Sequence, residues 1–139
     1  MTSAAGMLRV GLDLVHVPDV QDAVARQGER YLARLFTDHE RASCAGPPEV
    51  AARGLAARLA AKEATLKVLR PEAAQPPWRD IEVVRAPAGW CTLSLTGTAA
   101  SLKEEAGLVE LVLSITHEAE TAAAVVVGFR WPSAGSTRR

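Results

Sequence analysis

The spacing of hydrophobic and polar positions predicts one long helix in the middle of the chain and a strand near its start. Residues 48–69 are rich in alanine and place leucines at helical spacing, at positions 55, 59, 66 and 69, which is typical of a helix packed on a core. Residues 8–17 instead alternate as a strand does. In this strand Asp13 is an acid among apolar neighbours, and Gly11 permits a close approach to the backbone on the same face.

The other segments predict an α+β fold. Gly28 separates two short helices, a capping box of Thr37 and Glu40 starts a third, and Gly107 ends a fourth. Hairpin-like links between strands indicate antiparallel pairing, so we expect one long central helix packed across a mostly antiparallel sheet. The expected elements are helices over 19–26, 29–36, 37–44 and 98–106 and strands over 80–85, 91–96, 110–117 and 121–129, the last buried on both faces.

Composition limits the classes of protein that fit. The chain has 139 residues and 48% hydrophobic content, which suits a single domain with a real core. We expect the domain to span residues 1–131 and residues 132–139 to form a disordered basic tail. Lys and Arg total 16, as do Asp and Glu, so no nucleic-acid partner is indicated. No apolar stretch reaches the ~18 residues of a membrane span.

The cysteines and the N-terminus suggest a compartment. Cys44 and Cys91 lack metal-site spacing, and the first residues lack a basic region followed by an apolar run. We therefore expect free thiols in a cytoplasmic protein without a signal peptide.

Glu63 and Lys67 are the first candidates for chemistry, because they project from one face of the long helix about one turn apart. A carboxylate is a suitable oxygen ligand for Mg²⁺, and a neighbouring ammonium group can hold a phosphate that the metal also touches. The same pair equally fits an ordinary surface ion pair worth about 0.2–0.5 kcal/mol. Asp13 likewise fits either a metal ligand or an acid at a solvated sheet edge.

Three segments in chain order carry a resemblance to a known family: Gly11–Asp13, Arg58–Lys67 and Ser114–His117, with Trp78–Val83 between the last two. Over residues 8–130 the sequence resembles holo-(acyl-carrier-protein) synthase, the short, single-domain type of 4′-phosphopantetheinyl transferase. The resemblance implies the fold of that family. It also implies transfer of the phosphopantetheine arm of coenzyme A to a serine hydroxyl of an apo acyl carrier protein, with release of 3′,5′-ADP.

The resemblance also implies roles for particular residues. Asp13 and Glu63 would bind Mg²⁺, with pyrophosphate oxygens and water completing its shell. Glu63 is the first candidate for the general base and His117 the second. The short members of the family are homotrimers with active sites between subunits. The residues around the phosphates of coenzyme A would be Arg58, Lys62, Lys67 and His117, and those that grip an acidic helix of the carrier would be Arg26, Arg30 and Arg34.

The sequence departs from the family pattern in places. Residues 68–77 lack the glycines of a Gly-Thr-Gly-type turn, His16 stands where an acid is common, and Asp19 stands where a base is common. These departures lead to the hypothesis that the carrier is of the polyketide rather than the fatty-acid type. Two other interpretations remain open: a non-catalytic relative that binds coenzyme A or a carrier, and a purely structural oligomer.

Overall fold

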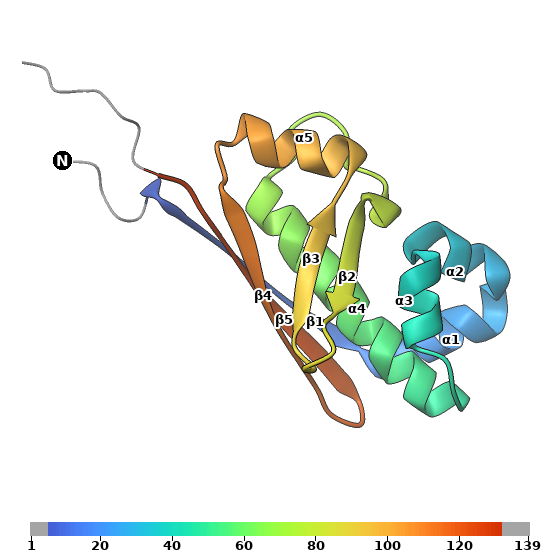
Figure 1. Cartoon of the computed structure of the whole chain (residues 1–139). Coiled ribbons are helices and arrows are strands. Elements are labelled where there is room, and N and C mark those ends of the chain that lie inside the picture. The colour runs from blue at the N-terminus through green and yellow to red at the C-terminus, as the bar shows by residue number, and fades with distance from the viewer. Residues whose placement is uncertain (1–5, 132–139) are drawn as a thin grey trace, which may run out of the picture.

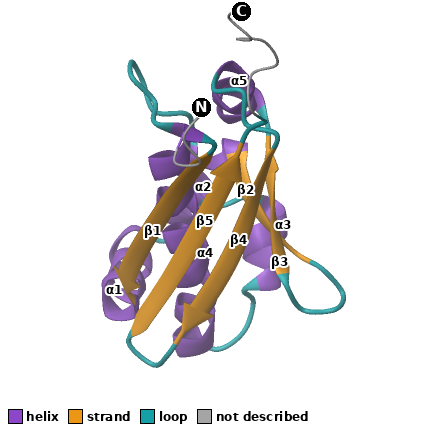
Figure 2. Ribbon diagram, turned by 90° about the vertical axis from the view of Figure 1, so that its left-hand side faces the viewer, coloured by secondary structure: helices purple, strands orange, loops and turns teal. Residues whose placement is uncertain are grey.

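The computed structural model describes residues 6–131, so the predicted tail lies outside the described residues. Strands β1 (Leu8–His16), β5 (Thr121–Phe129) and β4 (Glu110–His117) form an antiparallel sheet in the order β1-β5-β4 (Figure 2). Strands β2 (Ile81–Arg85) and β3 (Cys91–Leu95) pair as a separate hairpin. The α+β class and the antiparallel pairing are confirmed, although the strands divide into two sheets.

Helix α4 (Pro48–Leu69) has the predicted bounds and packs along β1 and β5 (Figure 1). Its alanines at positions 60, 61 and 64 are fully buried and let the helix approach the sheet closely. A β-carbon on Gly11 would lie 2.0 Å from the carbonyl oxygen of Ala64. Any side chain there would push α4 away from β1, and Asp13 would move with the strand.

Four shorter helices and a 3₁₀ turn complete the described chain: α1 (Val17–Gln27), α2 (Glu29–Leu35), α3 (Asp38–Ser43), η2 (Trp78–Asp80) and α5 (Gly97–Glu105). Gly28 separates α1 from α2 with a φ of 54° and a ψ of −128°, a conformation that favours glycine. The polypeptide therefore changes direction between Arg26 and Arg30. The basic residues lie on two helices and do not form one continuous helical stripe.

The predicted capping box at the start of α3 is confirmed. The Glu40 amide donates to Thr37 Oγ1 at 3.2 Å, and the Thr37 amide donates to Glu40 Oε1 at 2.9 Å. The other carboxyl oxygen of Glu40 accepts a hydrogen bond from the Val83 amide at 3.0 Å. Glu40 thus joins α3 to β2 in the interior.

No described element covers the outer face of the three-stranded sheet, as Figure 2 shows. On β1 it presents Leu8, Val10, Leu12 and Leu14, which are 50–67% exposed. Only alternate residues of β5 are buried, so the prediction that this strand is buried on both faces is wrong for the single chain. The face toward α4 instead carries Gly11 and Asp13.

Candidate active site

Asp13 and Lys67 meet where β1 passes α4. Asp13 lies on the inner face of β1, and its side chain is 15% exposed. The Lys67 ammonium donates to Asp13 Oδ1 at 3.3 Å and to the carbonyl oxygen of Leu12 at 2.6 Å. Glu63 lies one turn before Lys67 on the same face of α4. The structure therefore brings together Asp13, Glu63 and Lys67, as the sequence predicted.

The electrostatics of this group favour a bound cation. Burial, and then the neighbouring Asp13 carboxyl, raise the pKa of Glu63 to about 7, against a lowering by Lys67. Asp13 Oδ2 is buried and has no hydrogen-bond partner among the described residues. Two crowded carboxylates and one unpartnered oxygen fit a hard divalent ion that takes its remaining ligands from phosphate and water. No group of three or more His, Cys, Asp or Glu that could hold a metal occurs in residues 6–131.

A second, cationic group lines a cavity of about 430 Å³. Arg58 and His117 both border it, so the structure brings these two predicted residues together from α4 and β4. Arg58 is 7% exposed and donates from one terminal nitrogen to the carbonyl oxygen of Gly54 at 3.1 Å. Its Nε is buried and has no partner among the described residues. Arg53 and Arg85, which the sequence did not single out, line the same cavity.

The carboxylate group and the cationic cavity occupy different flanks of α4. Glu63 follows Arg58 by five residues, which is about 140° around a helix. Asp13 pairs with Ala124 of β5, whereas His117 lies at the end of β4, on the far side of β5. Within one chain, the 430 Å³ cavity therefore lies on a different flank of α4 from Asp13, which is not among its lining residues.

The carboxylate group and the cationic cavity both belong to a segment that matches one known sequence family. The model of the 4′-phosphopantetheinyl transferase superfamily matches residues 9–126. This chain belongs to that superfamily. The matched segment includes every predicted site residue from Asp13 to His117.

Relatives in the superfamily agree in sequence and in fold. The holo-(acyl-carrier-protein) synthase of Gloeobacter violaceus is 39% identical over 123 residues, covering 87% of this chain and 93% of that protein. A solved ACPS–CoA complex from Chronobacterium ammoniagenes is 30% identical with a TM-score of 0.77, covering 90% and 98% of the two chains. The acyl carrier protein synthase of Mycobacterium tuberculosis is 38% identical with a TM-score of 0.68, covering 89% and 98%.

Lys62 lies apart from the other candidate site residues of this chain. Its side chain is fully buried, and its ammonium contacts Glu40 Oε1 at 2.7 Å. It also donates to the carbonyl oxygens of Trp78, at 3.0 Å, and Ile81. Burial lowers the pKa of Lys62, while the Glu40 carboxylate raises it. The sequence-based assignment of Lys62 to coenzyme A is therefore corrected: its ammonium already has three protein acceptors and no exposed surface.

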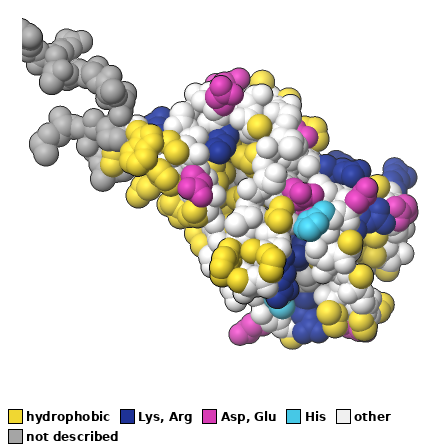
Figure 3. Space-filling model, viewed as in Figure 1, with side chains coloured by type: hydrophobic (Ala, Val, Ile, Leu, Met, Phe, Trp, Pro, Cys, Tyr) yellow, Lys and Arg dark blue, Asp and Glu magenta, His cyan; other side chains and the backbone are white. Residues whose placement is uncertain are grey.

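The three arginines predicted to dock a partner are all exposed. Arg26 lies in the last turn of α1, and Arg30 and Arg34 lie on α2. Figure 3 shows basic side chains gathered over this helical part of the molecule (Figure 3). Asp19 lies at the other end of α1, where its Oδ1 is 3.3 Å from Nδ1 of His16. The two residues that depart from the family pattern thus contact each other.

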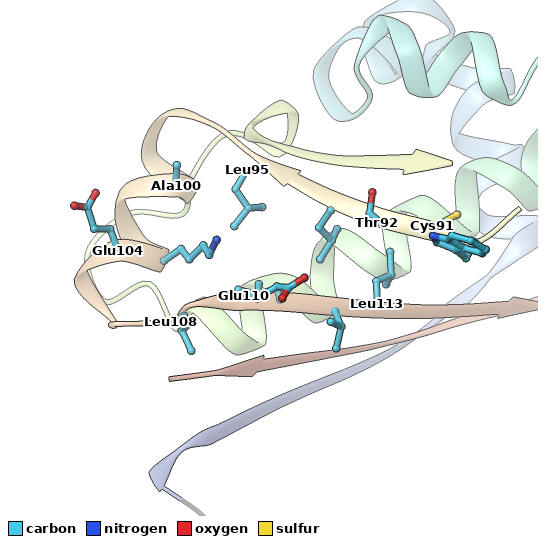
Figure 4. Close-up of a pocket in the computed structure, with 13 residues that line it drawn as sticks. Cys91, Thr92, Leu95, Ala100, Glu104, Leu108, Glu110 and Leu113 are labelled. Carbon is cyan, nitrogen blue, oxygen red and sulfur yellow. The ribbon is translucent and has the colours of Figure 1, made fainter. Parts of the chain in front are cut away.

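The larger cavity has a volume of about 710 Å³, and none of the predicted site residues lines it. It lies between β3, β4 and α5, and Leu95 and Leu113 extend into it from facing strands (Figure 4). Its lining is largely aliphatic, with Lys103, Glu104 and Glu110 at its border. The smaller cavity and the carboxylate group are the candidate site, because these carry the unpartnered polar atoms. No described helix is both long and apolar enough for a membrane span.

Proposed function

We propose that the protein is a holo-(acyl-carrier-protein) synthase, which transfers the 4′-phosphopantetheine arm of coenzyme A to a serine hydroxyl of an apo acyl carrier protein. One observation carries the proposal. The two buried side-chain atoms without partners among the described residues are Asp13 Oδ2 and Arg58 Nε. Buried polar atoms normally have partners, and a metal–phosphate ligand supplies a cation to the first and an oxygen to the second. The synthase names of the relatives support the same function.

Asp13 and Glu63 would hold Mg²⁺. When bound, the ion would neutralise charge on the leaving phosphate and align an in-line displacement. Lys67 fixes the Asp13 carboxylate and adds positive charge beside it. Glu63 would receive the proton of the attacking serine, directly or through water. His117 is the second candidate for the base.

The cationic cavity would bind the remaining phosphates of coenzyme A. Arg58 offers a buried donor, and His117 lies beside it. Arg53 and Arg85 add two further guanidinium groups, whose forked geometry suits phosphate oxygens. The leaving 3′,5′-ADP would stay in this cavity while the arm moves to the carrier.

We further infer a homotrimer with active sites between subunits. The exposed apolar face of β1 exceeds what isolated surface residues explain. The two half-sites on different flanks of α4 can meet only if one protomer supplies the carboxylates and a neighbour supplies the cationic cavity. Closed cyclic assembly satisfies both requirements.

Leu12→Glu should dissociate this assembly. Leu12 is 59% exposed on the outer face of β1, and a charge there would be desolvated in an interface. We expect sedimentation velocity to give the mass of a monomer, with loss of transfer activity. Val109→Glu is the matched control, because Val109 is also exposed, at 42%, but lies between α5 and β4 rather than on β1. Equal masses for wild type and Leu12→Glu would contradict the assembly.

The carrier would dock on the basic surface of α1 and α2. Arg26, Arg30 and Arg34 attract an acidic helix, whereas Asp19 at the start of α1 has an 80% exposed side chain and repels acids. This mixed surface favours a carrier that is not uniformly acidic, such as a polyketide-type carrier. We place the reaction in the cytoplasm, where the unpaired thiols of Cys44 and Cys91 stay reduced.

Metal binding should depend on pH with a defined sign. The pKa of Glu63 is raised to about 7 in the folded, metal-free protein, against ~4.3 in the unfolded chain. The stability that protonated Glu63 contributes is therefore fully present below pH ~4.3 and is lost as pH rises through 7. In EDTA we expect the melting temperature to fall between pH 5 and 8 more steeply for wild type than for Glu63→Gln. Mg²⁺ should raise the wild-type melting temperature at pH 8 and have little effect at pH 5. Equal effects at the two pH values would contradict a metal on Glu63.

The deciding experiment is the intact mass of two apo carrier proteins, one fatty-acid-type and one polyketide-type, after incubation with the protein, coenzyme A and Mg²⁺. A gain of one phosphopantetheine that EDTA abolishes is expected, with the polyketide-type carrier modified faster. Faster modification of the fatty-acid-type carrier would reject the carrier assignment alone. Binding of coenzyme A without any mass gain would identify a non-catalytic relative.

A further inference from the structure

Three arginines converge at the C-terminal end of α4. Arg9, on the inner face of β1, donates to the carbonyl oxygen of Val68 at 3.1 Å. Arg130, just after β5, donates from Nε to the carbonyl oxygen of Gly6 at 2.7 Å, and its amide bonds to Met7. Arg70 is the residue that ends α4. Burial, and then the charges of Arg70 and Arg130, lower the pKa of Arg9.

No acidic side chain within residues 6–131 forms an ion pair with this cluster. Residues 1–5 and 132–139 contain no Asp or Glu. The C-terminal end of α4 supplies only about half a negative charge. Guanidinium groups do not lose their protons in proteins, and each has five N–H donors. The cluster therefore keeps a large positive charge and spare donors.

Arg70 is held in a conformation that arginine disfavours. With a φ of 52°, it is the one non-glycine residue with positive φ in residues 6–131. A residue at this place after a helix is commonly glycine, because glycine adopts the left-handed conformation without strain. An arginine at a position that favours glycine motivates the hypothesis that its side chain has a role there.

The cluster lies within reach of the carboxylate half-site. Arg9 and Asp13 share the inner face of β1 four residues apart, which is about 14 Å at ~3.4 Å per residue. From phosphorus to sulfur the arm of coenzyme A has about 13 bonds, slightly more than the backbone of four extended residues, which spans about 14 Å at ~3.5 Å per residue. An arm whose phosphate lies at Asp13 can therefore bring an acyl group on its thiol close to Arg9.

We propose that Arg9, Arg70 and Arg130 form an oxyanion-binding site for the carboxylate of an acyl group on coenzyme A, such as a malonyl group. This inference rests on the proposed function. In the transfer, the serine oxygen bonds to the phosphorus that bears the arm, its proton passes to the base, and the bond to 3′,5′-ADP breaks. The thioester and its carboxylate are unchanged and travel with the arm. A paired guanidinium and carboxylate bind in a forked geometry that selects the charged acyl group.

The test compares kcat/KM for malonyl-coenzyme A and acetyl-coenzyme A, which differ by the carboxylate. Wild type should favour malonyl-coenzyme A by about tenfold or more, as expected of a charge-assisted hydrogen bond. The ratio should fall toward one in Arg70→Gly, although this variant should melt at a higher temperature because strain is relieved. Lys103→Gln removes the same charge on α5 and should keep the wild-type ratio. A ratio near one in wild type, or an unchanged ratio in Arg70→Gly, would overturn the proposal.

A second arm uses inorganic phosphate, with sodium chloride of equal ionic strength as the control. Phosphate should raise the melting temperature of wild type more than that of Arg70→Gly. If it does so while the malonyl-to-acetyl ratio is near one, the site binds a free oxyanion and the acyl assignment is wrong. If phosphate raises both melting temperatures equally, the cluster is not an oxyanion site. Absence of transfer from unacylated coenzyme A would instead reject the proposed function, and the phosphate arm would still decide the site.

Discussion

Asp13→Asn and Glu63→Gln should each lower kcat/KM for coenzyme A by about a thousandfold or more, because loss of a metal ligand removes several kcal/mol of transition-state stabilisation. Both substitutions keep the size of the side chain and remove only its charge. Neither should lower the stability of the metal-free protein, since each removes one charge from a site where burial, and then Asp13, raise the pKa of Glu63 to about 7. The ion pair that Asp13→Asn loses is with Lys67, whose side chain is 55% exposed, and such pairs contribute about 0–1 kcal/mol.

The two measurements are steady-state transfer to an apo carrier and thermal unfolding in EDTA. Glu49→Gln is the matched control, because Glu49 is an exposed carboxylate in the first turn of the same helix. It should keep wild-type turnover. Full Mg²⁺-dependent activity in either site variant would refute the metal assignment. A fall in melting temperature that matches the fall in activity would indicate a structural role for the pair instead.

Most elements could be predicted because local patterns determine them. The periodic leucines and alanines gave α4 its observed bounds, Pro48–Leu69, and Thr37 and Glu40 identified the start of α3. The alternation along β1 correctly showed which residues share a face. It could not show which face meets the core: α4 covers the face with Gly11 and Asp13, and the leucines are left outside. That choice follows from the close approach that glycine and alanine permit.

The site was predicted less completely, because its geometry depends on contacts distant in sequence. Glu63 and Lys67 are one turn apart, so their common face could be inferred. Arg58 belongs to the same helical segment yet lines a cavity on another flank, together with Arg53 and Arg85. No sequence pattern linked Arg85, at the end of β2, to this cavity. The separation of the half-sites appears only when the strand order is known.

Lys62 shows most clearly where sequence reasoning failed. It precedes Glu63, and adjacent helical residues point about 100° apart. Lys62 turns inward to a carboxylate 22 positions earlier in the chain, Glu40, which also caps α3 and binds the amide of Val83. Sequence spacing does not reveal such a partner, because the two residues lie on different elements.

Lys62→Met should therefore destabilise the protein by about 3–5 kcal/mol, the usual consequence of leaving one member of a buried ion pair without its partner. Methionine has a similar length, so the lost charge rather than a cavity dominates. The Glu40 carboxylate would remain fully buried, and the carbonyl oxygens of Trp78 and Ile81 would lose their donor. Urea unfolding monitored by far-UV circular dichroism measures the free energy of unfolding and its m-value.

The double variant Glu40→Gln/Lys62→Met provides the control, since it removes both charges and keeps an amide for the cap and for Val83. The loss of stability in the double variant should be about 1–3 kcal/mol smaller than the sum of the losses in the two single variants, because neither charge is left alone. Additive effects would mean that the pair does not interact as described. If Lys62→Met instead unfolds like wild type and raises KM for coenzyme A, the Lys62 ammonium binds the substrate, and its structural role is refuted.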